Sequence, residues 1–145
     1  ASKFGWGIDA SWTKWDSFQD LTVKYSNPNQ PPTSEHYGWR NTWFASVGGE
    51  YYANDKLTLR GGVAIDTTPT YDDTRSPRVP DSTRKWLAVG IGYKATDRFE
   101  INAGYAHIFV NNAHIAGVTD GTGDRLVGEN DDKGNLLSVS AKYAF

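Results

Sequence analysis

Apolar and polar residues alternate at successive positions through most of this chain. The last eleven residues, NLLSVSAKYAF, have one wholly apolar side and one mainly polar side. The apolar side consists of Leu137, Val139, Ala141, Tyr143 and Phe145. A period of two residues is typical of a β-strand with one apolar face, whereas an amphipathic helix repeats every three to four residues. The alternation therefore predicts an all-β protein.

The same period predicts about six long strands. They span residues 3–25, 42–53, 56–66, 85–95, 98–109 and 135–145. Each is as long as the roughly 9 to 11 residues with which an oblique strand crosses a bilayer, and longer than the roughly 5 or 6 of an average strand.

The first of these segments, residues 3–25, changes its apolar phase part-way. Even positions such as Ile8 and Ala10 are apolar at its beginning, and odd positions such as Leu21 and Val23 at its end. A β-bulge within one strand or a turn between two strands would explain the change. We expect the bulge, because one strand keeps all the long loops at the same edge of the sheet.

Short and long connections alternate along the chain. The links at residues 53–56 and 95–98 are tight and belong to a repeat, GGEYYANDKLTLRGG and GIGYKATDRFEINAG, at an offset of 42 residues. The connections over residues 26–41, 67–84 and 111–134 are long and polar. The acidic stretch 120–134 could gather Ca²⁺ or bridge to lipopolysaccharide through divalent ions, but it lacks EF-hand spacing and we expect a solvated loop. Short turns at one rim and long loops at the other are typical of an outer-membrane β-barrel.

Composition agrees with a barrel. The mean hydropathy of −0.60 is that of a soluble protein, yet 14% of the residues are aromatic. A barrel reconciles the two values, because half of each strand and all loops face water while aromatic girdles line both membrane interfaces. The expected girdles are Phe4, Tyr51, Tyr93, Phe99, Tyr143 and Phe145 near the short turns, and Trp12, Trp43, Tyr105 and Phe109 near the long loops. The alternative is a soluble or surface β-rich module that binds lipid or carbohydrate on Trp and Tyr platforms.

Charge and reactive residues exclude several functions. Lys and Arg number 15 against 17 Asp and Glu, a net charge of −2, so we expect no nucleic-acid partner. Cysteine is absent, which excludes disulfides and thiol catalysis. His36, His107 and His114 have neither metal-ligand nor catalytic-triad spacing. We therefore predict no metal, no cofactor and no enzymatic activity.

Three segments carry a resemblance to a known family. They are residues 37–70 (YGWRN to TTPT), residues 75–110 (RSPRVPD to HIFV) and the final aromatic strand. Their most specific features are Gly38-Trp39, Arg60-Gly61-Gly62, Asp66 followed by Pro69, and Gly104-Tyr105. The chain resembles the carboxy-terminal part of the FadL-type outer-membrane transporters for long-chain fatty acids and other hydrophobic compounds, such as aromatic hydrocarbons.

The resemblance implies that residues 1–145 are the carboxy-terminal portion of a single antiparallel transmembrane β-barrel domain of 14 strands, without its amino-terminal hatch and early strands. It implies passive uptake across the bacterial outer membrane, with a hydrophobic small molecule as substrate. The expected partners are outer-membrane lipid, lipopolysaccharide and the barrel-assembly machinery, and the full-length protein is expected to be a monomer.

Three residues on the predicted lumen-facing side are candidates for ligand contact: Phe44, Arg60 and Trp86. Passive uptake needs only an apolar route with a few polar groups that orient the ligand, and Arg60 would meet a carboxylate. Alternatively, Arg60 pairs with Glu50, Asp66 or Glu100 in a ladder that stiffens the wall, which we favour.

The apolar positions of the last strand are a second candidate site. The alternating set that ends at Phe145 resembles the carboxy-terminal signal read by the machinery that inserts outer-membrane barrels. We therefore expect Leu137, Val139, Ala141, Tyr143 and Phe145 to act as an assembly signal.

Overall fold

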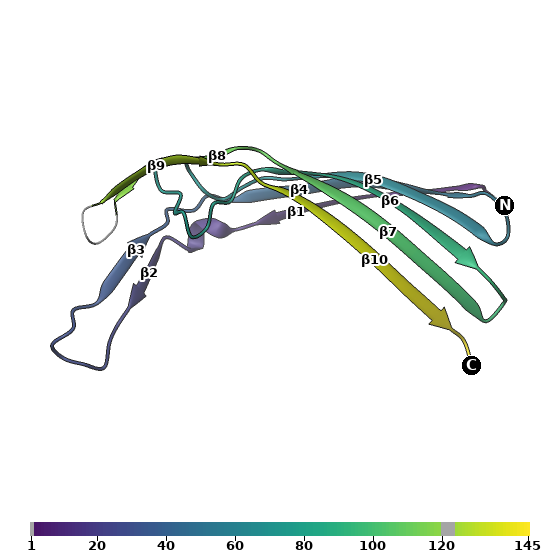
Figure 1. Cartoon of the computed structure of the whole chain (residues 1–145), viewed down its shortest axis with the longest axis horizontal. Coiled ribbons are helices and arrows are strands. Elements are labelled where there is room, and N and C mark those ends of the chain that lie inside the picture. The colour runs from purple at the N-terminus through teal and green to yellow at the C-terminus, as the bar shows by residue number, and fades with distance from the viewer. Residues whose placement is uncertain (1, 120–123) are drawn as a thin grey trace.

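Six antiparallel strands form one long, curved, open sheet (Figure 1). The computed structural model describes residues 2–119 and 124–145. The strands are β1 (Phe4–Thr13), β4 (Thr42–Tyr52), β5 (Leu57–Asp66), β6 (Arg84–Lys94), β7 (Phe99–Val110) and β10 (Lys133–Tyr143), in the order β1-β4-β5-β6-β7-β10. The all-β prediction is confirmed, and the last five predicted strands lie within about two residues of these bounds, the usual scatter at element ends.

The expectation of one bulged strand over residues 3–25 is wrong. β1 ends at Thr13, and the 3₁₀ turn η1 (Trp15–Ser17) leads the chain out of the main sheet. β2 (Asp20–Val23) then pairs with β3 (Thr33–His36) in a separate two-stranded sheet. The phase change in the sequence thus marks a turn between two strands that belong to different sheets.

The long connection over residues 111–134 contains strands that its sequence did not predict. β8 (Ala113–Thr119) and β9 (Arg125–Asn130) form a second two-stranded sheet within it. Ala113 and Ile115 of β8 are buried, at 1% and 6% exposed. The alternation in β8 is short, so it gave no clear strand signal. Residues 120–123 of the acidic stretch lie outside the described residues.

Tight turns and long connections lie at opposite ends of the sheet (Figure 1). The β4–β5 and β6–β7 turns share one end with both termini, and the β2–β3 and β8–β9 hairpins project from the other. In the first turn, Asn54 Oδ1 accepts hydrogen bonds from the backbone N–H of Lys56 and Leu57, at 2.9 Å each. Thr96 Oγ1 accepts from Arg98 and Phe99 in the same way, at 3.2 and 3.0 Å. The repeated sequence therefore encodes a repeated turn.

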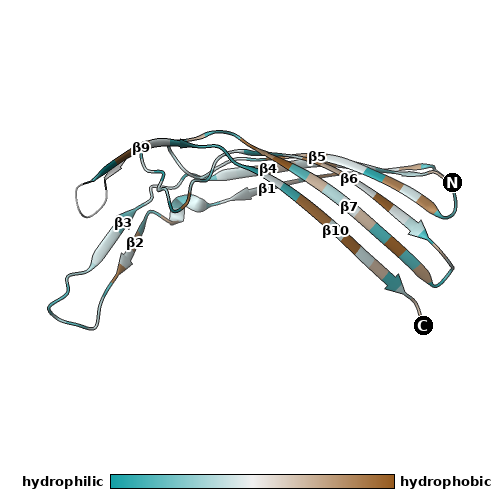
Figure 2. Ribbon diagram, in the orientation of Figure 1, coloured by the Kyte–Doolittle hydropathy of each residue, from teal (hydrophilic) through white to brown (hydrophobic). Residues whose placement is uncertain are grey.

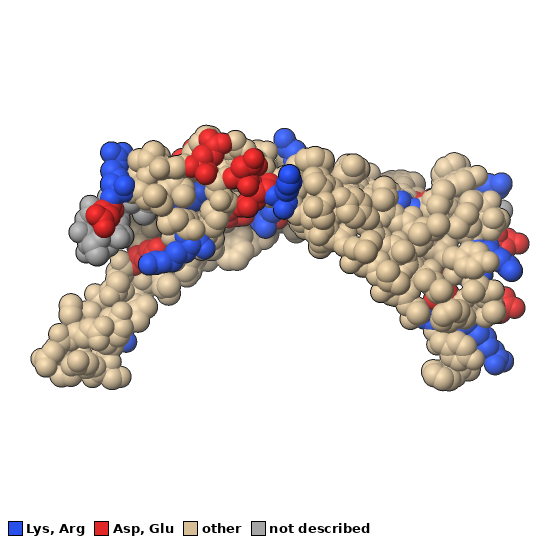
Figure 3. Space-filling model, viewed as in Figure 1, with Lys and Arg blue, Asp and Glu red and all other residues tan. Residues whose placement is uncertain are grey.

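One face of the sheet is apolar and uncovered. Val47, Val63, Val89 and Val139 are each at least half exposed, at 50%, 51%, 55% and 71%. Apolar and polar residues alternate along β7 and β10 in Figure 2, and the charged groups in Figure 3 lie on either side of a band that shows almost no charge. A sheet in water would have to cover such a face, whereas a membrane-spanning sheet presents it to lipid.

The border of this apolar face near the long loops climbs obliquely across the sheet. The last apolar residue before the first polar one is Leu137 on β10, Tyr105 on β7, Leu87 on β6, Ile65 on β5, Trp43 on β4 and Trp12 on β1. On β7, Phe109 lies beyond this border. In strand register, Leu137 is level with Trp6, six residues short of Trp12. Six residues of ~3.4 Å across five strand spacings of ~4.8 Å give a border inclined by about 40°. Strands of membrane barrels tilt by roughly 35–45°, so this border is level with the membrane surface when the strands are tilted.

Candidate functional site

Small residues cross the middle of the opposite face, which we call the lumenal face because it would line the inside of a barrel. Five of them lie in register on neighbouring strands: Gly7, Gly48, Gly62, Ala88 and Ala106. The resulting lumenal groove has a volume of about 630 Å³. A Cβ on Gly62 would lie 3.1 Å from the Val47 carbonyl oxygen, so larger residues there would both fill the groove and press on the backbone.

A ladder of polar side chains crosses one end of the lumenal groove. The Arg60 guanidinium on β5 contacts Glu50 Oε2 on β4 at 3.3 Å and donates to Asn102 Oδ1 on β7 at 2.8 Å. Asn102 in turn donates to Glu100 at 3.0 Å, and the Tyr52 hydroxyl donates to Glu50. The ladder ties β4 to β7 across β6, and it occupies the charge of Arg60.

Glycine on β6 makes this crossing possible. The Arg60 guanidinium passes over Gly92, where a Cβ would lie 2.9 Å from Arg60 Nη1 and 2.7 Å from Asn102 Oδ1. At Gly90, also on this face of β6, the nearest atom to a Cβ would be the Ala103 carbonyl oxygen at 3.4 Å. Gly92 is therefore the position where a side chain would collide with the ladder.

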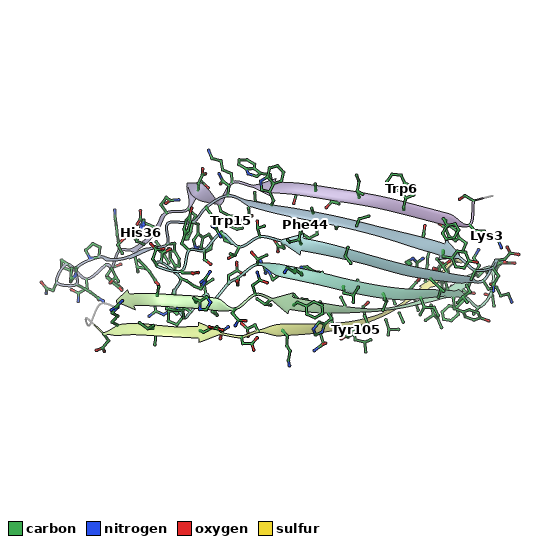
Figure 4. The ribbon with its side chains drawn as sticks, turned by 90° about the horizontal axis from the view of Figure 1, so that it is seen from above. Lys3, Trp6, Trp15, His36, Phe44 and Tyr105 are labelled. Carbon is green, nitrogen blue, oxygen red and sulfur yellow. The ribbon has the colours of Figure 1, made fainter. Side chains whose placement is uncertain are left out.

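A second cavity, which we call the mouth, lies at the long-loop end of the lumenal face. It has a volume of about 370 Å³. Its apolar lining consists of Trp15, Trp39, Phe44, Pro69 and Val79, and its charged lining of Asp66, Asp81 and Arg84. Trp15 and Phe44 are labelled in Figure 4 toward the long-loop end, with Lys3 at the opposite end. The mouth thus combines aromatic walls with a cluster of charges.

An aromatic cluster positions the two tryptophans of the mouth. The rings of Trp15 and Trp39 meet edge to face at 5.2 Å, and Phe18 lies 4.9 Å from Trp39. Gly38 has a φ of +57°, a left-handed conformation that glycine adopts without strain, and it turns the chain just before Trp39. Gln19 Nε2 donates to the backbone carbonyl of Trp39 at 3.0 Å. The Gly38-Trp39 pair thus has a structural reason, which is to bring an indole beneath the long loops.

Tyr37 also belongs to this aromatic cluster. Its ring lies 5.4 Å from Phe18. Burial, followed by the negative charge of Glu35, raises the pKa of the Tyr37 hydroxyl above its ordinary value of 10.0. The hydroxyl is therefore neutral at physiological pH and adds no charge to the mouth.

Residues 67–83, which we call the loop head, cover the mouth and are built around Arg75. This side chain is only 3% exposed. Its Nε donates to Thr70 Oγ1 at 3.1 Å and to the Asp81 carbonyl at 2.8 Å, while Nη1 contacts Asp72 Oδ1 at 2.5 Å and donates to the carbonyl of His114 on β8. A buried charge needs such full pairing. Arg75 therefore holds the loop head together and joins it to the β8–β9 hairpin.

The charges in the mouth neutralise one another only in part. Arg84 Nη2 lies 3.1 Å from Asp66 Oδ2 and 3.4 Å from Asp81 Oδ1. Asp81 also accepts a hydrogen bond from Thr68 Oγ1 at 2.6 Å. One guanidinium thus faces two carboxylates, which gives this group a net negative charge.

The three residues predicted to contact ligand do not come together in one place. Phe44 lines the mouth, Arg60 lines the lumenal groove, and Trp86 lies between them in register, level with Ala64 and Ile108. Trp86 Nε1 is buried and has no hydrogen-bond partner among residues 2–119 and 124–145. Sequence reasoning missed Trp15 and Trp39, although Gly38-Trp39 was a specific feature of the family resemblance.

The histidines are dispersed over three parts of the structure. His36 pairs with Asp20 across the β2–β3 hairpin at 2.7 Å, and His114 with Glu129 across the β8–β9 hairpin at 3.1 Å. His107 contacts Asn135 at 2.8 Å. In the part of the chain that the structure describes, no three His, Asp or Glu side chains are grouped as metal ligands. Within that same part, no helix has the length and apolar character to cross a membrane.

Comparison with known proteins identifies the family of this chain. The family described as "Outer membrane protein transport protein (OMPP1/FadL/TodX)" matches residues 1–145. The chain belongs to this family. A crystal structure of a Pseudomonas aeruginosa FadL homologue is 38% identical and superposes with a TM-score of 0.88, covering 99% of this chain and 33% of that protein.

Curated relatives of this FadL/TodX chain carry matching names. The long-chain fatty acid transport protein of Escherichia coli O6:H1 is 29% identical over 143 residues, which cover 97% of this chain and 31% of the relative. Outer membrane protein P1 of Haemophilus influenzae is 26% identical over 132 residues, covering 91% and 27%. The chain thus spans about a third of the length of these proteins. It is a β-rich protein of the bacterial outer membrane in a family of transport proteins.

Proposed function

We propose that this chain is the carboxy-terminal wall of a single 14-stranded barrel that takes up long-chain fatty acids or aromatic hydrocarbons passively. The inner hatch and the other strands belong to the rest of that protein. One observation carries the proposal: the lumenal face holds an aromatic mouth at its long-loop end and a groove lined by small residues further along. In membrane barrels the long loops face outward, so a ligand would meet the mouth first.

The mouth is suited to the apolar body of a ligand. Trp15, Trp39 and Phe44 offer aromatic surface, and burial of apolar area drives binding without a covalent step. Arg84 is already occupied by two carboxylates, so an anionic group gains little there. The tail of a fatty acid or the ring of an arene would enter the mouth, while a carboxylate would remain toward water.

The groove continues the route along the same face. Phe44 is four residues from Gly48 on β4, so a ligand that moved from the mouth along this strand would reach the row of small residues. Arg60 and Trp86 remain our candidates for later ligand contact. Because the ladder occupies Arg60, we expect that residue to act on a ligand mainly by keeping the wall in shape.

Uptake by cells that carry the full-length protein tests this proposal. Phe44→Ala removes an aromatic wall of the mouth, and Trp43→Ala is a matched control because Trp43 faces lipid from the next position of β4. Loss of one buried aromatic contact, roughly 1.5 kcal/mol, should lower the uptake of labelled oleate or toluene about tenfold below saturation. The control should keep normal uptake. Equal uptake of both substrates by Phe44→Ala and unmodified protein would contradict the proposal.

We also propose that the end of β10 is the assembly signal of the barrel. Leu137, Val139, Ala141 and Tyr143 alternate on the lipid-facing side, and the Tyr143 and Phe145 rings are 5.2 Å apart. Deletion of Phe145 from the full-length protein should lower the amount assembled in the outer membrane, measured by heat-modifiable migration. Unchanged assembly would contradict this role.

A further inference from the structure

Polar groups interrupt the lipid-facing side of three neighbouring strands. His107 on β7 and Asn135 on β10 are level with Leu87 on β6. One step further toward the long loops, Lys85 on β6 and Lys133 on β10 flank Phe109 on β7. On β6 and β10, these side chains lie immediately beyond the oblique border that ends the apolar face. They are thus level with the membrane surface on the long-loop side.

These groups are mainly hydrogen-bond donors. Asn135 Oδ1 accepts from the Tyr105 hydroxyl at 2.6 Å, and His107 Nδ1 contacts the same oxygen at 2.8 Å. The carboxamide oxygen of Asn135 is therefore occupied, and among the described residues its Nδ2 has no hydrogen-bond partner. Within residues 2–119 and 124–145, the ammonium groups of Lys85 and Lys133 also form no ion pair.

Acidic residues near this cluster belong to the turn before β10. Asp131 and Asp132 precede Lys133, and Asp132 accepts a hydrogen bond from Asn130. The lipid-facing positions of β6, β7 and β10 include no acidic residue. The site therefore presents positive charge and N–H groups toward the lipid.

We propose that Lys85, Lys133, Asn135 and His107 bind a phosphate of lipopolysaccharide in the outer leaflet. Two strand spacings separate the two lysines, a backbone distance of roughly 10 Å that their flexible side chains can close around one phosphate. Basic groups beside a hydrophobic span recognise anionic lipid head groups in this way. The acyl chains would then lie along Leu87, Val89 and Leu137. The long-loop end of a barrel faces outward, which selects the leaflet that contains lipopolysaccharide.

Lipid carried by the full-length protein tests the site. The protein is purified from outer membranes in a mild detergent, and bound lipopolysaccharide is measured per protein by native mass spectrometry. Lys85→Ala with Lys133→Ala should retain at least threefold less lipopolysaccharide than the unmodified protein. Lys94→Ala with Lys142→Ala is the matched control, because these lysines lie on the same two strands and both flank Glu100 on the lumenal face. This control should retain the normal amount.

Two further experiments distinguish a loss of charge from a loss of folding, and lipopolysaccharide from another anionic lipid. Lys85→Arg with Lys133→Arg keeps both charges and should restore binding, even if the alanine variant assembles poorly. In vesicles, lipopolysaccharide should displace lipid bound at Lys85 and Lys133 at a lower concentration than phosphatidylglycerol does. Equal retention by the alanine pair and its control, failure of the arginine pair to bind, or equal competition by phosphatidylglycerol would each overturn the proposal.

Discussion

The six-stranded wall exposes its large apolar side chains, whereas the loop head buries polar ones. On the wall, large apolar side chains such as Trp6 and Leu137 are exposed, both at 80%. In the loop head, Thr68, Thr70 and Arg75 are buried. The wall has lipid as its solvent, so apolar groups can remain outside. The loop head lies in water and has few apolar residues, so hydrogen bonds and ion pairs must hold it together.

This difference predicts which substitutions would destabilise each region. The wall should be sensitive to charge on its outer face and tolerant of it on the lumenal face. The loop head should be sensitive to the loss of one buried polar group and indifferent to exposed charges. Substitutions that reverse these expectations would break the comparison.

The largest effect is expected from a charge placed in the middle of the apolar face. Val47→Arg should lower the free energy of unfolding by about 2–4 kcal/mol, the cost of an arginine near the bilayer midplane. Urea titration of the full-length protein in lipid vesicles measures it. Ser46→Arg is the control, because Ser46 faces the lumen and pairs in register with Asp9. A similar loss for both variants would mean that the two faces do not differ in solvent.

The next effect concerns the loop head. Arg75→Ala leaves the carbonyls of Asp81 and His114 without their donor, and each lost bond to a charged group costs roughly 1.5–3 kcal/mol. Limited proteolysis of the loop head should therefore accelerate about tenfold to a hundredfold, while the barrel stays assembled. Arg78→Ala is the control, since the Arg78 side chain is 78% exposed and its ion pair is with Glu35 of β3. If Arg75→Ala were as resistant to proteolysis as the unmodified protein, Arg75 would not be the residue that holds the loop head together.

The smallest effect concerns the polar ladder. Alanine in place of a strand glycine gains about 0.5–1 kcal/mol from chain entropy. Gly90→Ala has ordinary clearance and should show that gain, whereas Gly92→Ala meets Arg60 and Asn102 and should lose it. We expect Gly92→Ala to be less stable than Gly90→Ala by roughly 1 kcal/mol, the net value of one hydrogen bond, in the same urea titration. Equal stability would show that the ladder adds nothing to the wall.

The strands of the wall were predictable because each carries its own signal. A period of two residues along β4 to β7 and β10 gave both the strand and the face of each residue. Tight turns were equally local, since Asn54 and Thr96 hold them through neighbouring backbone groups. Structure that depends on neighbouring residues can be predicted from a sequence without knowledge of distant contacts.

The loop head and the mouth depend on contacts between distant residues. Arg75 meets the His114 carbonyl, and Trp39 meets Trp15, across stretches that no local pattern connects. The turn at η1 was missed for the same reason, because the pairing of β2 with β3 rather than with β4 decides it. Phe44 was identified from its lumenal face, but its aromatic neighbours were not.

Cysteine scanning along the last strand tests the central claim most directly, namely that the two faces of the wall meet lipid and water. The chain contains no cysteine of its own, so single substitutions from Leu137 to Lys142 report without background from these residues. In the full-length protein in lipid vesicles, a water-soluble maleimide should label positions 138, 140 and 142 at least tenfold faster than 137, 139 and 141. A spin label at positions 137, 139 and 141 should collide more often with oxygen dissolved in the lipid than a label at positions 138, 140 and 142. Equal labelling along the strand, with no period of two residues, would contradict the account.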